Sequence, residues 1–420
     1  MTINIKDYVL EMARKAKDAS RSLVAMSADN KNKILKEMAK ALRDKKDFIL
    51  EANKEDLKEG ENSNLSEAML ERLLLDNKRV EQMAKGLEDV AALDDPVGRV
   101  LDKKTRPNGL EISKISVPIG VIAIIFESRP NVTSDAAALC IKSGNAVILR
   151  GGKEAIGSNM AIAQVMNEAA SRIKAPDGML QLVETTDREA VNELLKLNSY
   201  IDLVIPRGGE GLIKAVVENA TIPVIKHYKG ICHIYVDKDA DIDKALNIVI
   251  NAKCQRPGVC NAVETLLIDE QIARTHLPLI AAKLRKSGVE LRGCEKTARI
   301  IKDVVKADGQ DWKTEYLDLI LSIKIVDGVA QAIKHINDYG SMHSDAIITE
   351  NKVTASKFLN MVDASSVYFN ASTRFTDGGE FGMGAEIGIS TDKIHARGPM
   401  GLEELNIYKY VIKGDGQIRE

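Results

Sequence analysis

Apolar residues in the N-terminal part of the chain recur every three or four positions. One such stripe consists of Ile34, Leu35, Met38 and Leu42, and a second of Val80, Met83, Leu87 and Val90. Side chains at these spacings share one face of an α-helix, so the pattern predicts a block of amphipathic helices from residue 5 to about residue 93. Ser27 is suited to cap the second of these helices, because its hydroxyl can accept a backbone N–H. We expect this block to serve as a packing scaffold.

Beyond Pro118 the pattern changes to short apolar runs that alternate with helical segments. The runs GVIAIIF, NAVILR and IDLVIP predict buried strands, and the stretches between them, such as VTSDAAALCIKSG, predict helices. This alternation is typical of a parallel sheet with crossover helices. A second series of the same kind starts at ICHIYVD and continues to about Asn360. We therefore predict an α/β protein with a doubly wound nucleotide-binding domain and a second α/β domain.

A short excursion interrupts this order before the first strand. Residues 98–116 contain two alternating runs around Pro107-Asn108-Gly109, which predicts a projecting β-hairpin. The predicted organisation is a cofactor-binding domain of residues 1–97 and 117–228, a catalytic domain of residues 229–365, a flap of residues 98–116 and 396–420, and a return of residues 366–395 to the cofactor domain.

Composition and charge exclude several classes of protein. The 59 basic and 61 acidic residues are interspersed and give a formal net charge of −2, which provides no field suited to a nucleic-acid backbone. No apolar run approaches the roughly twenty residues of a membrane span, and the charged N-terminus lacks the apolar core of a secretory signal. The five scattered cysteines favour free thiols in a reducing compartment. We expect a cytoplasmic protein that binds neither nucleic acid nor membrane.

A cysteine in a loop that contains proline and glycine is the most informative single residue. Cys260 lies in NAKCQRPGVCNAVETLLID, between a predicted helix and an apolar strand. Loops held by rigid elements often carry nucleophiles, and Arg256 or Lys253 would favour the reactive thiolate if it faced the sulfur. Taken alone, a free cysteine is more often a small buried apolar residue. No metal site is indicated, because Cys254 and Cys260 have no matching second pair.

Several longer segments resemble a known group of enzymes. The aldehyde dehydrogenase superfamily contains segments similar to ESRPNVTSDAAALCIKSGNAVILRGGKEA, QRPGVCNAVETLL and EIGISTDKIHARGPMGLEELNIYKYV, in the same order along nearly the whole chain. The resemblance is strongest to the members that reduce an acyl phosphate. It implies a Rossmann-type cofactor domain, a second α/β catalytic domain and a small oligomerisation flap. It also implies that Cys260 is the nucleophile and that the side-chain amide of Asn131 helps to stabilise the oxyanion.

The same resemblance implies a set of cofactor-binding residues. The GxGxxG fingerprint is absent here, as it is in that superfamily. The implied residues are Arg150, Gly151, Gly152 and Lys153 at a strand end, Gly208 and Gly209 beneath the pyrophosphate, and Glu315 at the nicotinamide ribose. The positive charges of Arg150 and Lys153 would suit a 2′-phosphate, so we expect NADPH rather than NADH.

His227 stands near the position at which hydrolytic members of the superfamily carry a glutamate base. Without a carboxylate to activate water, a thioester on Cys260 should persist until phosphate or hydride reaches it, which favours acyl-phosphate chemistry. The role of His227 stays open between an acid or base and a packing residue. The candidates for binding the substrate are Arg129, Arg256, Arg397 and His343, and each of them could equally be structural.

The reaction that the resemblance implies is the NADPH-dependent reduction of L-glutamyl 5-phosphate to L-glutamate 5-semialdehyde and phosphate, the second step of proline biosynthesis. A hydrolytic semialdehyde dehydrogenase of the same superfamily is the alternative. A catalytically silent scaffold of the same fold and a cysteine hydrolase that uses Cys260 and His227 are two further rivals. The flap implies a homo-oligomer, a dimer or tetramer. Association with glutamate 5-kinase, which makes the unstable substrate, is left open.

Overall fold

The computed structural model describes residues 4–419 and divides them into two compact units. The first unit contains residues 4–226, 382–388 and 400–419, and the second contains residues 227–381 and 389–399. Both units combine helices with parallel sheets, which confirms the predicted α/β fold class. Within residues 4–419, every helix is too short or too polar to span a membrane.

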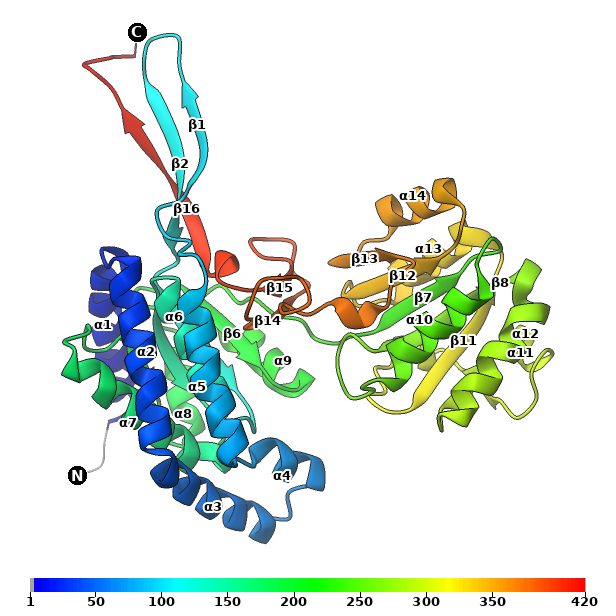
Figure 1. Cartoon of the computed structure of the whole chain (residues 1–420), viewed down its shortest axis with the longest axis horizontal. Helices are drawn as coiled ribbons and strands as arrows, with labels where there is room; N and C mark the ends of the chain where they lie inside the picture. Colours follow the sequence, from blue (N-terminus) through cyan, green and yellow to red (C-terminus); the bar gives the residue numbers. More distant parts are fainter. Residues whose placement is uncertain (1–3, 420) are drawn as a thin grey trace. The chain divides into compact units, whose positions relative to one another are not determined.

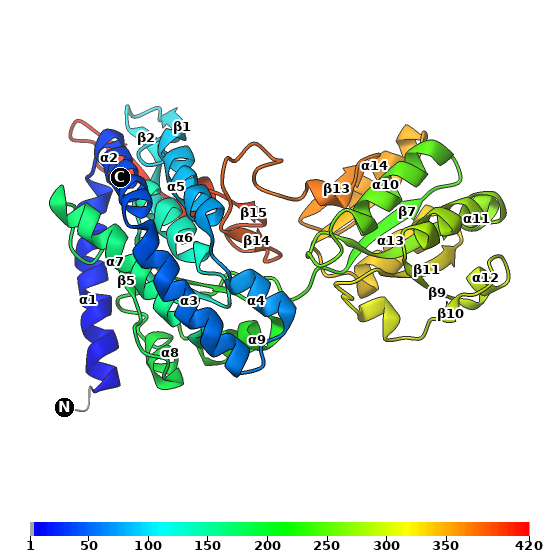
Figure 2. The same cartoon turned by 60° about the horizontal axis from the view of Figure 1, so that its bottom comes forward.

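The first unit begins with the predicted block of amphipathic helices. These are α1 (Ile5–Val24), α2 (Ala28–Asp44), α3 (Lys46–Asn62), α4 (Glu67–Leu73) and α5 (Asn77–Ala92). Ser27 caps α2 as predicted, because its side chain accepts the N–H of Asn30. The apolar stripe of α2 is buried, and α2 lies beside α5 (Figure 1 and Figure 2). The helical spacing of apolar residues thus predicts this block correctly.

A four-stranded parallel sheet forms the core of the first unit. Its strands in spatial order are β5 (Leu180–Leu182), β4 (Ala146–Arg150), β3 (Val121–Phe126) and β6 (Leu203–Arg207). The helices that accompany them are α6 (Asn131–Lys142), α7 (Ile156–Arg172), α8 (Arg188–Leu194) and α9 (Glu210–Asn219). The strand order reverses between β3 and β6, and ligands of open α/β sheets bind beyond the carboxyl ends of the strands at such a point. The loops after Phe126 and Arg207 leave the sheet there.

The predicted hairpin is part of a small antiparallel sheet. It contains β1 (Val100–Thr105), β2 (Glu111–Pro118) and β16 (Asn406–Lys413) in the order β1-β2-β16. Gly109 has a φ of 87° in the turn between β1 and β2, a conformation that favours glycine. Figure 1 shows the three strands as an arm that extends from the helices of the first unit. The exposed apolar side chains of the arm are Val100, Leu101, Ile407, Tyr408, Tyr410 and Ile412.

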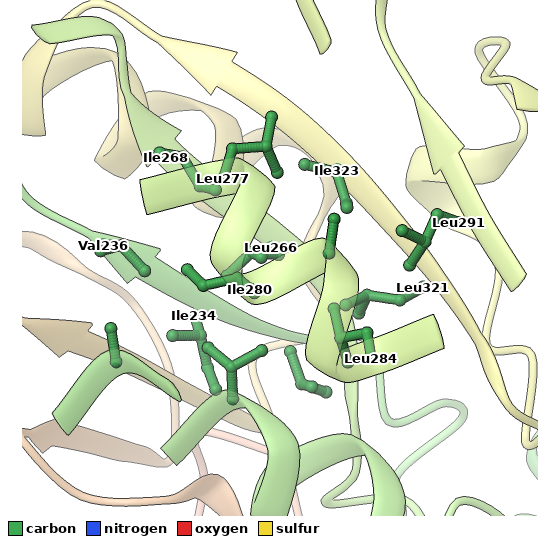
Figure 3. Close-up of a cluster of buried hydrophobic side chains, with 14 of the residues drawn as sticks. Ile234, Val236, Leu266, Ile268, Leu277, Ile280, Leu284, Leu291, Leu321 and Ile323 are labelled. Atoms are coloured by element: carbon green, nitrogen blue, oxygen red, sulfur yellow. The ribbon is translucent and has the colours of Figure 1, made fainter. Parts of the chain in front are cut away.

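The second unit is built on a seven-stranded parallel sheet. Its strands in spatial order are β10 (Val305–Lys306), β9 (Glu290–Gly293), β11 (Ile320–Val326), β8 (Val263–Asp269), β7 (Cys232–Val236), β12 (Ser344–Ile348) and β13 (Ser366–Phe369). Its helices are α10 (Ile242–Cys254), α11 (Glu270–Lys286), α12 (Glu295–Ala298), α13 (Gly328–Tyr339) and α14 (Lys352–Met361). Ile234 and Leu266 pack with side chains of α10 and α11 on one face (Figure 3), and Tyr235 and Leu267 pack with α13 and α14 on the other. Successive strand residues point to opposite faces, so both faces are covered.

The remaining elements are short. They are the 3₁₀ helices η1 (Lys153–Ala155), η2 (Asp311–Lys313), η3 (Thr373–Phe375) and η4 (Glu403–Leu405) and the paired strands β14 (Gly388–Ser390) and β15 (Gly398–Met400).

Two predicted domain assignments differ from the structure. The sequence predicts that residues 366–395 return to the cofactor domain, whereas residues 366–381 and 389–395 belong to the second unit and only residues 382–388 to the first. Residues 396–399, which the sequence assigns to the flap, also belong to the second unit. Residues 366–381 do so because β13 pairs with β12 and so extends the second sheet. A strand of only 4 residues carries no pattern that identifies the sheet it joins.

Candidate active site

Cys260 lies in the loop that joins α10 to β8, and its side chain is half-buried. The helix α10 before this loop and the strand β8 after it both contribute side chains to the hydrophobic core of the second unit. The loop is also held by η3 and the residue that follows it. Thr373 Oγ1 donates to the carbonyl oxygen of Asn261 at 2.7 Å, and Nδ2 of Asn261 donates to the carbonyl oxygen of Thr376 at 2.9 Å. These bonds fix the position of the loop, as a nucleophile requires.

The carbonyl group of Cys260 lies against the segment that leads into β7. Sγ of Cys232 donates to this carbonyl oxygen at 3.2 Å. Burial raises the pKa of Cys232 well above its ordinary value, so this thiol remains protonated and acts as a donor. The N–H of Gly230 donates to Oε1 of Glu315 at 2.9 Å. The structure thereby brings the predicted nucleophile and the predicted ribose-binding glutamate together through Gly230.

Gly230 is required by a close approach of two backbone segments. A Cβ on this residue would lie 1.8 Å from the carbonyl oxygen of Cys260. We expect Gly230→Ala to displace the Cys260 loop and to lower turnover by about 100-fold, the effect of misplacing a reacting group by about 1 Å. Turnover and the rate of Cys260 alkylation should fall together. Gly309→Ala is the matched control, because a Cβ there would have no heavy atom within 4 Å. Equal turnover in both variants would contradict the expectation.

His343 is fully buried next to Cys232. Its Nδ1 lies 2.8 Å from Oγ of Ser344 and 3.8 Å from Sγ of Cys232. Burial lowers the pKa of His343 to about 3, so the ring is neutral. The ring of His227 lies edge-on to it, with 5.7 Å between the centroids. His343 therefore supports Cys232 in this structure, and its predicted contact with the substrate stays a prediction.

Lys253, which the sequence offers as a possible cation beside the sulfur of Cys260, is paired with a carboxylate instead. Its Nζ forms an ion pair with Oε2 of Glu264 at 2.6 Å, and both side chains are 0% exposed, so its charge is met by this carboxylate. The other carboxylate oxygen, Oε1, accepts the N–H of Leu317 at 3.3 Å. The pair thus connects both sides of the Cys260 loop to the segment that carries Glu315. Glu264 is not among the residues predicted from the sequence, although a carboxylate within the apolar run VETLLID is a signal of a buried ion pair.

In the first unit, Arg150 ends β4 at the carboxyl edge of the sheet. Its Nη1 donates to the carbonyl oxygen of Gly151 at 2.8 Å, and its Nη2 donates to that of Thr186 at 3.4 Å. Its Nε is buried without a hydrogen-bond partner among residues 4–419. Burial lowers the pKa of Arg150, and the neighbouring positive charge of Arg188 acts in the same direction. Lys153 is exposed in the next turn. Two cations, Arg150 and Arg188, and the carboxylate of Glu154 thus interact where the sequence predicts a 2′-phosphate.

The predicted glycines lie at the same edge. A Cβ on Gly152 would lie 2.1 Å from Oε1 of Glu154, and a Cβ on Gly208 would lie 2.3 Å from Oε2 of Glu127. The N–H of Gly209 donates to Oε2 of Glu127 at 2.8 Å, so this carboxylate lies at the N-terminus of α9, where anions are favoured. Glu127, the acidic residue that directly follows β3, is not among the site residues predicted from the sequence. Glycine backbone and cationic side chains at a switch point fit the phosphates of a dinucleotide.

The other predicted site residues lie in both units. Asn131 begins α6 in the first unit, and its Nδ2 donates to Oδ2 of Asp135 at 2.8 Å. Arg129 is exposed in the loop before α6. Arg397 belongs to the second unit and forms an ion pair with Asp363 at 2.7 Å. The predicted roles of these residues toward the substrate stay predictions. Within residues 4–419, no three or more His, Cys, Asp or Glu side chains are grouped so as to hold a metal ion.

Comparison with known proteins defines the class. The model of the aldehyde dehydrogenase family matches residues 5–299. The chain belongs to this family, and the predicted class of enzyme, an oxidoreductase of aldehyde groups, is confirmed.

Relatives with high sequence identity are named as reductases of an acyl phosphate, which are the members that the sequence resembles most strongly. A gamma-glutamyl phosphate reductase from Caldanaerobacter subterraneus is 57% identical over 97% of this chain and 99% of its own length. One from Moorella thermoacetica is 56% identical over 100% of both chains. The crystal structure of a gamma-glutamyl phosphate reductase from Thermotoga maritima is 50% identical, covers 98% of this chain and 100% of its own, and matches with a TM-score of 0.97. The predicted resemblance is therefore confirmed.

Proposed function

We propose that this chain catalyses the NADPH-dependent reduction of L-glutamyl 5-phosphate to L-glutamate 5-semialdehyde and phosphate, the second step of proline biosynthesis. The observation that carries the proposal is the half-buried Cys260 on a fixed loop, linked through Gly230 to Glu315. The relatives named gamma-glutamyl phosphate reductase, which are 57% and 56% identical to this chain, support the same reaction.

The reaction begins at the sulfur of Cys260. The thiolate attacks the carbonyl carbon of the acyl phosphate, and phosphate departs to leave a thioacyl group on Cys260. The side-chain amide of Asn131 and the backbone N–H of Cys260 are the proposed donors to the oxygen that becomes negative during this attack. Bound NADPH supplies a hydride for the acyl carbon. The bond between that carbon and the sulfur of Cys260 then breaks, which releases the aldehyde and regenerates the thiolate.

The cofactor residues act by binding and orientation. Arg150 and Lys153 would pair with the 2′-phosphate, because Arg150 ends β4 and Lys153 is exposed in the turn that follows it. The backbone of Gly208 and Gly209 would approach the pyrophosphate closely, since neither residue has a side chain. The carboxylate of Glu315 would accept hydrogen bonds from the hydroxyl groups of the nicotinamide ribose. These roles favour NADPH over NADH.

The exposed apolar side chains of β1, β2 and β16 support the further proposal of a homo-oligomer formed through this arm. Val100 and Tyr410 are 59% and 58% exposed. Exposing apolar surface to water is unfavourable, and contact with a second copy of the chain would bury this surface.

Phosphate dependence tests the proposed reaction and separates it from hydrolytic oxidation of the same semialdehyde. Reduction of NADP⁺ by glutamate semialdehyde, followed by absorbance, should require added phosphate, because phosphate must release the acyl group from Cys260. The value of kcat/KM should be higher with NADP⁺ than with NAD⁺, since the 2′-phosphate adds charge-assisted hydrogen bonds. Equal rates without phosphate would favour the hydrolytic enzyme. Failure to bind NADPH would favour a silent scaffold, and turnover without any nicotinamide would favour a cysteine hydrolase.

A further inference from the structure

Arg374 bonds to both sides of the loop that carries Cys260. It lies in η3, and its Nε donates to Oε1 of Gln255 at 2.7 Å, while its Nη1 donates to Oδ1 of Asn261. Gln255 precedes Cys260 in the loop, and Asn261 follows it directly. The guanidinium therefore spans the Cys260 loop. Its Nη2 has no hydrogen-bond partner in the part of the chain that the structure describes.

A second guanidinium group belongs to the loop itself. Arg256 is exposed and forms no ion pair within residues 4–419. Burial lowers the pKa of Arg374, the charge of Arg256 lowers it further, and negative charge at Cys260 opposes both effects. The hydrogen bond from Arg374 to Gln255, the residue directly before Arg256, places the two arginines near each other at the Cys260 loop.

Neither guanidinium is bonded to a carboxylate of the described residues. Asp377 opposes the effect of Arg256 on Arg374, but its Oδ1 accepts the N–H groups of Gly379 and Glu380 at 2.9 and 3.4 Å. Arg374 is half-buried and Arg256 is exposed. Two neighbouring cations repel each other, and an anion bound between them would remove this repulsion. The planar fork of a guanidinium group matches the oxygens of a phosphate.

On the basis of the proposed function, we propose that Arg256 and Arg374 bind the phosphate group of the acyl phosphate and the free phosphate of the reverse reaction. The sulfur of Cys260 forms a bond to the acyl carbon, the bond from that carbon to the phosphate oxygen breaks, and its electron pair leaves with the phosphate. Negative charge thus moves from the sulfur to the phosphate. The two guanidinium groups beside the loop stabilise it there. Arg374 is therefore both a support for the Cys260 loop and a ligand of the phosphate.

Protection of Cys260 from alkylation tests this site without relying on turnover. Iodoacetamide should alkylate Cys260 in the full-length protein, measured by mass spectrometry of the peptide that contains it, and inorganic phosphate should slow this reaction. Arg256→Gln and Arg374→Gln should each raise the phosphate concentration for half-protection by about 10-fold to 100-fold, the effect of one lost charge-assisted hydrogen bond. The KM for phosphate in NADP⁺ reduction should rise in parallel, and the KM for NADP⁺ should not change.

Two features of the design separate phosphate binding from a structural effect. Arg256 makes no hydrogen bond to another residue of the loop, so Arg256→Gln alone decides the question if Arg374→Gln does not fold. Arg274→Gln, at an exposed arginine on α11, should keep the protection of the wild type.

Three results would overturn the inference. Unchanged protection in both Arg256→Gln and Arg374→Gln would overturn it directly. Phosphate-dependent turnover without protection of wild-type Cys260 would overturn this site and leave the proposed function intact. Turnover without any need for phosphate would instead remove the proposed function and this site together.

Discussion

Cys260→Ser should lower turnover by about 10⁴-fold or more, the effect of removing a catalytic nucleophile, and should leave NADPH binding nearly unchanged. A serine hydroxyl is not ionised near neutral pH, whereas a cysteine thiolate is an accessible nucleophile. The substitution should preserve the loop, because the contact with Cys232 uses the carbonyl oxygen of residue 260 and not its sulfur. The loss would therefore report on the sulfur itself.

Turnover measured by absorbance and NADPH binding measured by fluorescence would check this expectation. The matched control is Cys294→Ser, another half-buried cysteine of the second unit, which should retain turnover. A Cys260→Ser variant with more than a small fraction of wild-type turnover would contradict the proposed nucleophile. Loss of NADPH binding in that variant would point to a structural effect instead.

The parts of the fold that the sequence predicts are those with strong local patterns. The run GVIAIIF corresponds to β3, whose burial on both faces makes the apolar run continuous and easy to recognise. The helical stripe of α2 and the cap at Ser27 are equally local signals. The loop of Cys260 is recognisable for the same reason, because it stands between a clear helix and a clear strand, but the pattern alone does not make Cys260 a nucleophile.

The contacts that the sequence does not predict join residues far apart in the chain. Arg374 bonds to Asn261, 113 positions earlier, and Gly230 bonds to Glu315, 85 positions later. Hydrophobic periodicity describes neighbours along one element and contains no information on such pairs. The family resemblance supplied Cys260 and Glu315 but not the backbone approach at Gly230. Only the three-dimensional structure reveals that approach.

Lys253→Met should lower the free energy of unfolding by about 3–5 kcal/mol, the cost of removing one partner of a buried ion pair. Lys253 and Glu264 are both 0% exposed, so the substitution leaves the carboxylate of Glu264 in a buried place without its opposite charge. Chemical denaturation of the full-length variant would measure the loss. The alkylation rate of Cys260 should change as well, because α10 and β8 flank its loop.

The loss in Lys253→Met should depend on pH. Burial raises the pKa of Glu264 to about 7, and Lys253 opposes this effect, so removing Lys253 should raise the pKa further. The folded variant then holds a proton on Glu264 that the unfolded chain, with its ordinary pKa of 4.5, releases. The free energy of unfolding should therefore fall as pH rises above 4.5 and continue to fall through the raised pKa. The deficit relative to the wild type should be larger at about pH 8 than at about pH 5.5.

Lys253→Met combined with Glu264→Gln should recover much of this stability at about pH 8, because a neutral amide replaces the unpaired charge. The carbonyl oxygen of the new amide can still accept the N–H of Leu317, which Glu264 accepts at 3.3 Å in the wild type. A deficit in Lys253→Met that stays constant with pH would mean that lost packing of the lysine stem, and not the charge of Glu264, causes the destabilisation. If the double variant recovers stability only at high pH, the charge of Glu264 causes the destabilisation. Glu264 is the carboxylate that accepts the N–H of Leu317, in the segment that carries Glu315.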